Sequence, residues 1–193
     1  MKLRTLFVAG AMLPLGAAAQ DASRALDYTF VEAAYVDQEV DAGPFDIDGD
    51  GLSLLGSVAI TDSVFLLGQY TSYDYDGGLD VTTYSLGAGM RWGLKPELDL
   101  VGDIGWVHSE IDRRGLPDID DDGFQLGVGL RARVHDAIEV QAGIRHIDLD
   151  DSDTYLEAGG RYYLTDNVAV GLGLSLNDDD TGWSLSLRAE FGN

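Results

Sequence analysis

The sequence predicts an all-β protein, a transmembrane antiparallel up-and-down β-barrel of about ten strands that follows a cleaved signal peptide. Three observations lead to this fold class. Apolar and polar residues alternate with a period of two in many segments, short and Asp-rich connections take turns along the chain, and charge is segregated between strands and connections. Eight strands remain an alternative if the first two segments are not a strand pair.

Residues 1–19 have the features of a secretory signal peptide. Lys2 and Arg4 give a positive start, Leu6 to Leu15 form an apolar stretch, and Ala19 ends a run of small residues suited to cleavage. The stretch is shorter than the roughly 20 apolar residues that a membrane-spanning helix needs. We therefore expect 1–19 to be removed and 20–193 to form one outer-membrane β-barrel domain. The chain contains no cysteine, so disulfides do not stabilise it.

Period-two alternation is clearest in 84–93 and 123–134, where one face is apolar and the other carries glycine, serine, glutamine and arginine. No apolar stripe of helical period persists over a useful length, which favours strands throughout. The predicted strands are 26–36, 51–60, 64–73, 80–93, 97–109, 123–134, 138–148, 154–164, 168–176 and 182–191.

The connections between these segments are of two alternating kinds. The short ones are 61–63, 95–96, 135–137 and 165–167, and the Asp-rich ones are 37–50, 74–80, 110–122, 148–153 and 177–181. The Asp-rich connections hold 22 of the 34 acidic residues, with only Arg113 and Arg114 as basic residues. This pattern predicts an array of hairpins with tight turns at one end and acidic loops at the other.

Charged residues within the strands all fall on the face opposite the apolar one, and acids and bases are equal in number. A narrow lumen is poorly hydrated, so charges inside it must pair. We predict a lumenal charge network made of Glu32, Arg91, Asp99, Asp103, Arg131, Arg133, Glu139, Arg145, Glu157, Arg161, Arg188 and Glu190.

Aromatic residues mark the ends of the apolar face, as in the interfacial girdles of outer-membrane barrels. They are Tyr35, Tyr84, Trp92, Trp106, Phe124, Tyr162, Trp183 and Phe191. A soluble sandwich or barrel would place the apolar face in its core instead. The balanced charges, the aromatic positions and the small residues on the polar face together favour a membrane barrel.

The chain resembles the small outer-membrane β-barrel proteins of Gram-negative bacteria, the OmpA/OmpX-like superfamily. The resemblance rests on the alternation, the turn spacing and the last strand, which ends at Phe191 much as family members end on an aromatic; here Gly192 and Asn193 follow. A fainter likeness to small xanthomonad outer-membrane barrels lies in "FVEAAY", Phe30 to Tyr35. The resemblance implies a location in the bacterial outer membrane.

Two stretches match the opening of a calcium-binding loop, "DIDGDG" at 46–51 and "DIDDDG" at 118–123. Position 12 of such a loop needs Glu, but Ser57 and Gly129 stand there. We therefore expect no cofactor and at most weak Ca²⁺ or Mg²⁺ binding shared among loop carboxylates. The weak metal candidates are Asp46, Asp48, Asp50, Asp118, Asp120 and Asp122.

Catalysis would need a histidine near a hydroxyl or an acid. His108 and His146 lie near the loop end but on the lipid-facing parity, and His135 lies in a tight turn. The sequence shows no nucleophile elbow and no phosphate-binding loop. These observations make an enzyme acting on lipid or surface substrates the least favoured of three functions.

The favoured function is a small structural outer-membrane barrel with a plugged, charge-paired lumen and acidic extracellular loops, serving surface interaction or envelope integrity. A narrow passive channel that prefers cations is the alternative. The partners expected are outer-membrane lipid, lipopolysaccharide and the barrel-insertion machinery, for a monomeric protein. A net charge of −22 without a basic patch excludes nucleic acid as a partner.

Overall fold

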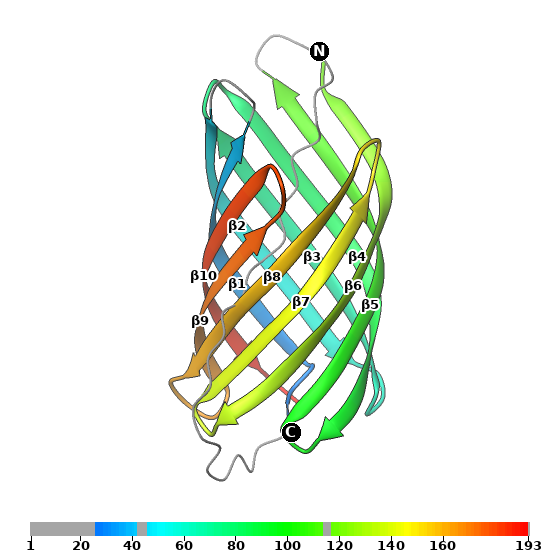
Figure 1. Ribbon diagram of the computed structural model, residues 1–193, viewed down its shortest axis with the longest axis vertical. Coiled ribbons are helices and arrows are strands. Elements are labelled where there is room, and N and C mark those ends of the chain that lie inside the picture. Colours follow the sequence, from blue (N-terminus) through cyan, green and yellow to red (C-terminus); the bar gives the residue numbers. More distant parts are fainter. Residues whose placement is uncertain (1–25, 42–45, 114–116, 193) are drawn as a thin grey trace.

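The computed structural model describes residues 26–41, 46–113 and 117–192. They form one closed antiparallel barrel of ten strands, in which each strand pairs with its neighbour in the sequence (Figure 1). The predicted all-β barrel is confirmed with ten strands, and the eight-strand alternative is wrong. The expected signal peptide lies outside the described residues. No helix in the described part of the chain is suited to crossing a membrane.

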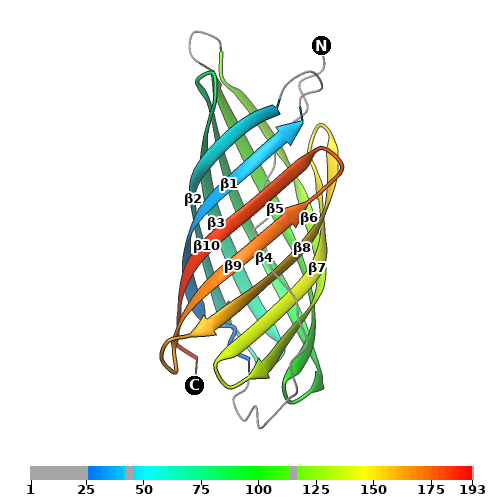
Figure 2. The ribbon, with the colours of Figure 1, turned by 60° about the vertical axis from the view of Figure 1, so that its left-hand side comes forward.

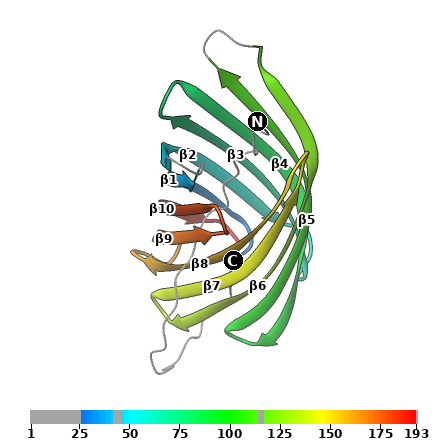
Figure 3. The same cartoon turned by 45° about the horizontal axis from the view of Figure 1, so that its top comes forward.

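The strands are inclined to the long axis of the barrel, as closure requires (Figure 3). Their bounds are β1 Phe30–Asp41, β2 Asp46–Ala59, β3 Val64–Tyr75, β4 Leu79–Lys95, β5 Leu98–Arg113, β6 Ile119–His135, β7 Ile138–Asp148, β8 Ser152–Tyr163, β9 Val168–Leu176 and β10 Asp180–Glu190.

The barrel closes where β1 pairs with β10, seen side by side in blue and red in Figure 2. The register runs from Phe30 opposite Glu190 to Val40 opposite Asp180. Closure removes the sheet edges, so every strand has two hydrogen-bonded neighbours, as a lipid environment demands.

Two of the tight turns use the same local chemistry. Thr61 Oγ1 accepts hydrogen bonds from the amides of Ser63 and Val64, at 3.2 and 3.0 Å. Thr165 Oγ1 accepts from Asn167 and Val168 in the same way, at 3.4 and 3.1 Å. The repeated Thr-Asp phrase of the sequence is therefore a repeated turn in which the threonine hydroxyl takes up free backbone amides.

The predicted acidic loops are wrong in extent, because most of their residues belong to strands. All of "DIDGDG" lies at the start of β2, and all of "DIDDDG" except Asp118 lies at the start of β6. Asp and Gly have low strand propensity, but the strands are already paired in the lower barrel, and the same register continues through these residues. The wall is also uneven in height, since β4, β5 and β6 rise above β9 and β10 (Figure 1).

The strands reverse their pattern along their length. In the lower part of β1, Val31 and Tyr35 face outward and Glu32 faces inward; further up, Glu39 faces outward while Val36 and Val40 are buried inside. The other long strands do the same, so the upper barrel has an apolar interior and an acidic exterior. The predicted polar inner face therefore holds only for the lower part, since the upper part projects beyond the lipid into water.

The first strand also starts later than predicted. Residues 26–29 precede β1 and belong to no strand, yet Leu26, Asp27 and Tyr28 are buried. They cannot continue the ladder, because the pairing of β1 with both neighbours begins at Phe30. This short segment packs inside the barrel rather than on its wall.

Candidate functional site

Ion pairs fill the lower barrel, between the tight turns and the middle of the strands. The structure places all twelve charged residues of the strand interiors on the inner face, and each one belongs to an ion pair of 3.7 Å or less. They form three groups, which are the pair Arg91 and Asp99, the triad Asp103, Arg145 and Glu157, and a larger network of the remaining seven.

Glu139 on β7 is the centre of the larger network and is fully buried, at 0% exposure. Arg131 grips it with two hydrogen bonds, of 2.7 Å to Oε1 and 3.0 Å to Oε2. Arg133 and Arg161 reach the same carboxylate at 3.3 and 3.1 Å, and the Tyr163 hydroxyl donates to it at 3.0 Å. Three guanidinium groups around one carboxylate need further acids, and the network supplies them.

Glu32 on β1 provides part of that compensation. Its Oε2 accepts from Arg188 at 2.8 Å and from Arg161 at 3.0 Å, so it joins β1 to β8 and β10. Glu190 lies 3.7 Å from Arg131 and accepts a short hydrogen bond from Tyr163. The network thereby joins five strands, β1, β6, β7, β8 and β10, by charged hydrogen bonds, which are among the stronger polar contacts.

A cavity of about 200 Å³ adjoins this network, and Arg131, Arg161 and Arg188 form part of its lining. One side is apolar and includes Phe30, Phe65 and Leu67, whereas the other carries the triad. Arg145 donates to Asp103 at 2.9 Å and to Glu157 at 3.0 Å, so at this level acids outnumber bases by two to one. The cavity is mixed in character and holds an excess of negative charge on one wall.

Glycines on the inner face make room for larger groups. A Cβ on Gly127 would lie 2.3 Å from an oxygen of Asp103, and one on Gly49 would lie 2.2 Å from the ring of Tyr75. The small residues of the polar face thus serve charged side chains in the lower barrel and aromatic rings in the upper barrel.

Above the cavity the interior is apolar and tyrosine-rich. One buried cluster consists of Val36, Val40, Tyr73, Tyr75, Val81 and Ile111, and a second of Val107, Ile147, Leu149 and Tyr155. The Tyr75 hydroxyl donates to Gln38 at 2.7 Å, so its polar end is satisfied inside this apolar layer. None of these tyrosines lines the cavity.

Asp180 sits within this upper layer, above the outer aromatic residues, and sequence reasoning missed it. Tyr155 donates to its Oδ2 at 3.0 Å, and the Asn177 amide does so at 3.1 Å. Burial raises the pKa of Asp180 to about 6, although the bonds from Tyr155 and Asn177 lower it. The sequence assigned this residue to a solvated loop, and only the continuation of β10 turns it inward.

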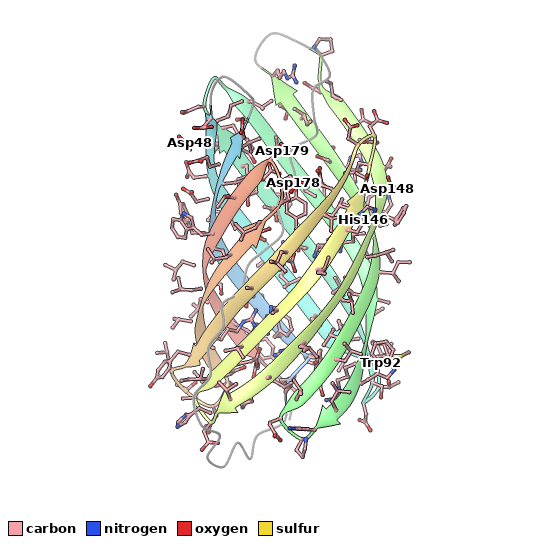
Figure 4. The ribbon with its side chains drawn as sticks, viewed as in Figure 1. Asp48, Trp92, His146, Asp148, Asp178 and Asp179 are labelled. Carbon is pink, nitrogen blue, oxygen red and sulfur yellow. The ribbon has the colours of Figure 1, made fainter. Side chains whose placement is uncertain are left out.

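Aromatic side chains form two bands on the outer surface. All eight predicted girdle residues are exposed there. At the upper level Tyr35 lies 5.6 Å from Trp183, Tyr70 lies 5.3 Å from Tyr84, and Trp106 pairs with Phe124 in the register. Trp92 marks the lower band (Figure 4). The exposed apolar surface between the bands is the lipid-facing belt of a membrane barrel.

The metal candidates lie in rows on the outer wall above the upper band. Asp46, Asp48 and Asp50 all point outward from β2, because residues two apart share a face of a strand. Asp120 and Asp122 do so on β6, and the exposed Asp118 directly precedes that strand. A strand spreads such carboxylates along a line, whereas a calcium loop wraps them around one ion. The residues described here contain no group of three or more His, Cys, Asp or Glu suited to holding a metal.

Acids also face acids across the strands. Asp37, Glu39 and Asp41 of β1 stand opposite Asp50, Asp48 and Asp46 of β2. Further round the wall, a hydrogen bond with Asp80 and the charge of that residue raise the pKa of Asp74, and Asp118 does the same for Asp112. Figure 4 shows other acids of the upper end, among them Asp148, Asp178 and Asp179. The upper wall is thus a like-charged acidic surface, which we call the acidic collar.

His108 and His146 both lie on the outer wall. His108 Nδ1 is 3.1 Å from Asp122 Oδ1 and its ring stacks on Trp106 at 5.7 Å, whereas His146 Nδ1 is 3.0 Å from Thr154 Oγ1. Figure 4 shows His146 near the upper end of the wall. The barrel wall separates both rings from the interior cavity. His135 is the last residue of β6, and its Nδ1 accepts a hydrogen bond from the Ala137 amide in the following tight turn.

The comparisons with known proteins agree with this architecture. The chain belongs to the outer membrane protein beta-barrel domain family, which it matches over residues 5–174. It is therefore a bacterial outer-membrane β-barrel protein of the Gram-negative envelope, with buried charge pairs inside. No curated protein is significantly similar in sequence.

Three solved structures illustrate the likeness. The transport unit of the autotransporter AIDA-I from Escherichia coli is 10% identical with a TM-score of 0.51, covering 90% of this chain and 93% of that one. The attachment invasion locus protein Ail of Yersinia pestis is 15% identical with a TM-score of 0.47, covering 86% and 99%. The N-terminal barrel of Pseudomonas aeruginosa OprF is 18% identical with a TM-score of 0.46, covering 86% and 100%. At these identities the likeness concerns the fold alone.

Proposed function

We propose that this protein is a structural barrel of the outer membrane whose lumen is closed by its own side chains. The observation that carries the proposal is the presence of two buried layers, one on each side of the cavity. The lower layer is the charge network around Glu139, and the upper layer is the apolar interior around Tyr73, Tyr75 and Tyr155.

The two layers resist opening for different physical reasons. Separating Glu139 from Arg131 would leave charges unpaired in a poorly hydrated interior, which costs far more than parting a surface pair. Opening the upper layer would expose apolar side chains to water. A passage for ions would have to disrupt both layers at once.

Planar-bilayer recording tests the closed lumen. We expect purified, folded protein to give no large, stable open conductance, and such a conductance would contradict the proposal. The alternative is a narrow cation-preferring channel, which the excess of Asp103 and Glu157 over Arg145 supports. It predicts a small cation-selective current that falls in Asp103→Asn and is unchanged in Asp166→Asn, an exposed turn control.

We also propose that the acidic collar contacts lipopolysaccharide through bridging divalent cations. The opposed carboxylates of β1 and β2 support this, because shared cations would lower the repulsion between them. These paired positions include no basic residue that could bind a lipopolysaccharide phosphate directly. Calorimetry with Ca²⁺ should show weak binding at several equivalent sites, weaker still in Asp48→Asn with Glu39→Gln. One tight stoichiometric site would count against a shared collar.

The remaining parts of the proposal concern assembly and chemistry. We propose a monomer that the barrel-insertion machinery places in the outer membrane, in which neither His108 nor His146 is catalytic. Substitution of both histidines with alanine should leave lipid A and surface substrates unchanged in cells. Altered lipid A in those cells would point to an enzyme instead.

A further inference from the structure

The segment Leu26–Thr29 crosses the mouth of the barrel at the end with the tight turns. Leu26 and Tyr28 are only 5% and 6% exposed although they precede the first strand. The segment enters beside β1 and β10, yet the Tyr28 hydroxyl donates to Asp99 at the start of β5, at 2.8 Å. Since β5 lies across the lumen from β1 and β10, the segment spans the opening.

Tyr28 is the main anchor of this segment. Its ring packs against Phe65 with 4.9 Å between centroids, and the guanidinium of Arg131 lies over it at 4.7 Å. Its carbonyl oxygen accepts a hydrogen bond from Ser57 at 2.8 Å. The contacts come from β2, β3, β5 and β6, so a single side chain and its backbone touch much of the circumference.

Arg131 ties the segment to the charge network. Its Nη1 donates to the Asp27 carbonyl at 2.6 Å, while its other nitrogens hold Glu139. The other end of the segment is tied to the residue directly after β10, because the Phe191 amide donates to the Thr29 carbonyl at 2.8 Å. Gly192 lies so close to Asp27 that a Cβ there would meet the carboxylate at 2.4 Å.

The segment forms the floor of the cavity but no part of the wall. Tyr28 lines the cavity, whereas strand pairing starts at Phe30. Releasing the segment would therefore uncover the part of the cavity that Tyr28 lines, beside the charge network, and leave every ladder of the barrel intact. Short segments outside the strand ladders, held by a few contacts, are typical of local opening well below the global free energy of unfolding.

We propose that Leu26–Thr29 is a releasable plug, anchored by Tyr28, whose departure admits small polar solutes from the periplasmic side to the cavity while the barrel stays folded. The inference goes beyond the closed structural barrel, because it adds an opening on one side only. The upper apolar layer remains in place when the plug leaves.

Cysteine labelling tests the plug, since the natural chain has no cysteine. Ser186→Cys places a thiol on the cavity wall with almost no change in size. The protein is reconstituted in liposomes, and a membrane-impermeant thiol reagent is added to one side. Asp166→Cys, in an exposed tight turn, identifies the turn side by its rapid reaction.

We expect Tyr28→Ala to speed labelling of Ser186→Cys from the turn side by at least about tenfold, because it removes both the ring and a hydrogen bond to a charged group. Tyr28→Phe should give a smaller increase. Tyr162→Ala, an exposed tyrosine at the same end, should give none. Heat-modifiable gel migration shows that each variant is folded, and Asp99→Asn replaces Tyr28→Ala if the latter does not fold.

Equal labelling rates in folded Tyr28→Ala and parent protein would overturn the plug. Faster labelling of Tyr28→Ala only from the side of the acidic collar would also overturn it. Rapid labelling of the parent from the side of the acidic collar would instead contradict the closed lumen of the proposed function. The comparison of Tyr28→Ala with the parent from the turn side would still test the plug.

Discussion

Single buried residues in this barrel matter through the partners that they leave behind. Glu139 has three guanidinium groups and a tyrosine hydroxyl around one carboxylate, at 0% exposure. The attraction within a buried ion pair roughly balances the desolvation cost of its charges. Glu139 therefore matters mainly because its loss would leave three buried guanidinium groups without this partner.

Glu139→Ala should therefore destabilise the folded barrel by about 3–5 kcal/mol, the usual cost of stranding a buried partner. Urea unfolding followed by the heat-modifiable gel band measures the change. Asp166→Asn, which removes one exposed acid of a tight turn, is the control and should have almost no effect. A Glu139→Ala midpoint equal to that of the control would show that the network is not paired as described.

Asp180 makes stability depend on pH in the opposite sense to a paired surface acid. Because its folded pKa is raised from 3.8 to about 6, the unfolded chain releases this proton at lower pH than the barrel does. Its contribution to stability therefore falls as pH rises from about 4 to about 6. The stability of Asp180→Asn relative to the wild type should therefore increase from about pH 4 to about pH 6. The difference in urea midpoint between the two proteins at several pH values measures this increase. A constant difference would refute the assignment.

At the scale of the strand, the reversal of the two faces is the main feature. Below the upper aromatic band the strands are apolar outside, and above it they are apolar inside. On β5, Trp106 and Glu110 face outward at successive levels, whereas Val107 is 1% exposed inside. The outward face of one strand thus contacts lipid in its lower part and water in its upper part. In the sequence, a Trp, Tyr or Phe stands at the change.

Val107→Asn tests this reversal. A polar amide in the buried upper layer should cost about 1–3 kcal/mol, because Val107 packs in a cluster with the apolar side chains of Ile147 and Leu149. Glu110→Asn, on the outward face of the same strand, should cost little or even stabilise by removing a like charge from the collar. Equal effects of the two variants on the urea midpoint would mean that the upper barrel is not sided as the structure has it.

At the scale of the whole molecule, the lumen is divided into three levels of different chemistry. Charges close the bottom, a mixed cavity occupies the middle, and valines, isoleucines and tyrosines fill the top. On the proposed function these closures are independent, since they share no side chain.

Two independent closures predict that neither opening alone conducts. Glu139→Ala or Tyr75→Ala should each leave a planar bilayer silent, and only the double variant should pass ions. The single variants are each other's matched control. Stable current through either single variant would show that one of the layers does not seal the lumen.

The sequence by itself determined the fold class, favoured ten strands over eight, and assigned the charges of the lower strands to one side of the sheet. It could do so because successive residues of a strand point to opposite faces of the sheet, so the position of a residue in the strand fixes its face. The alternating short and long connections indicated a series of hairpins, which can close into a barrel. The predicted tight turns and outward aromatics are confirmed in the structure.

Only the tertiary structure decided where strands end, what pairs across the lumen and what closes it. Asp-rich stretches such as 46–51 have turn composition, so their place in β2 depends on neighbours that hold the ladder. Glu32 meets Arg188 from the far end of the chain, and Tyr28 reaches Asp99 across the mouth. Such contacts depend on barrel closure and stagger, which bring residues distant in sequence to one level, and alternation carries no information about that level.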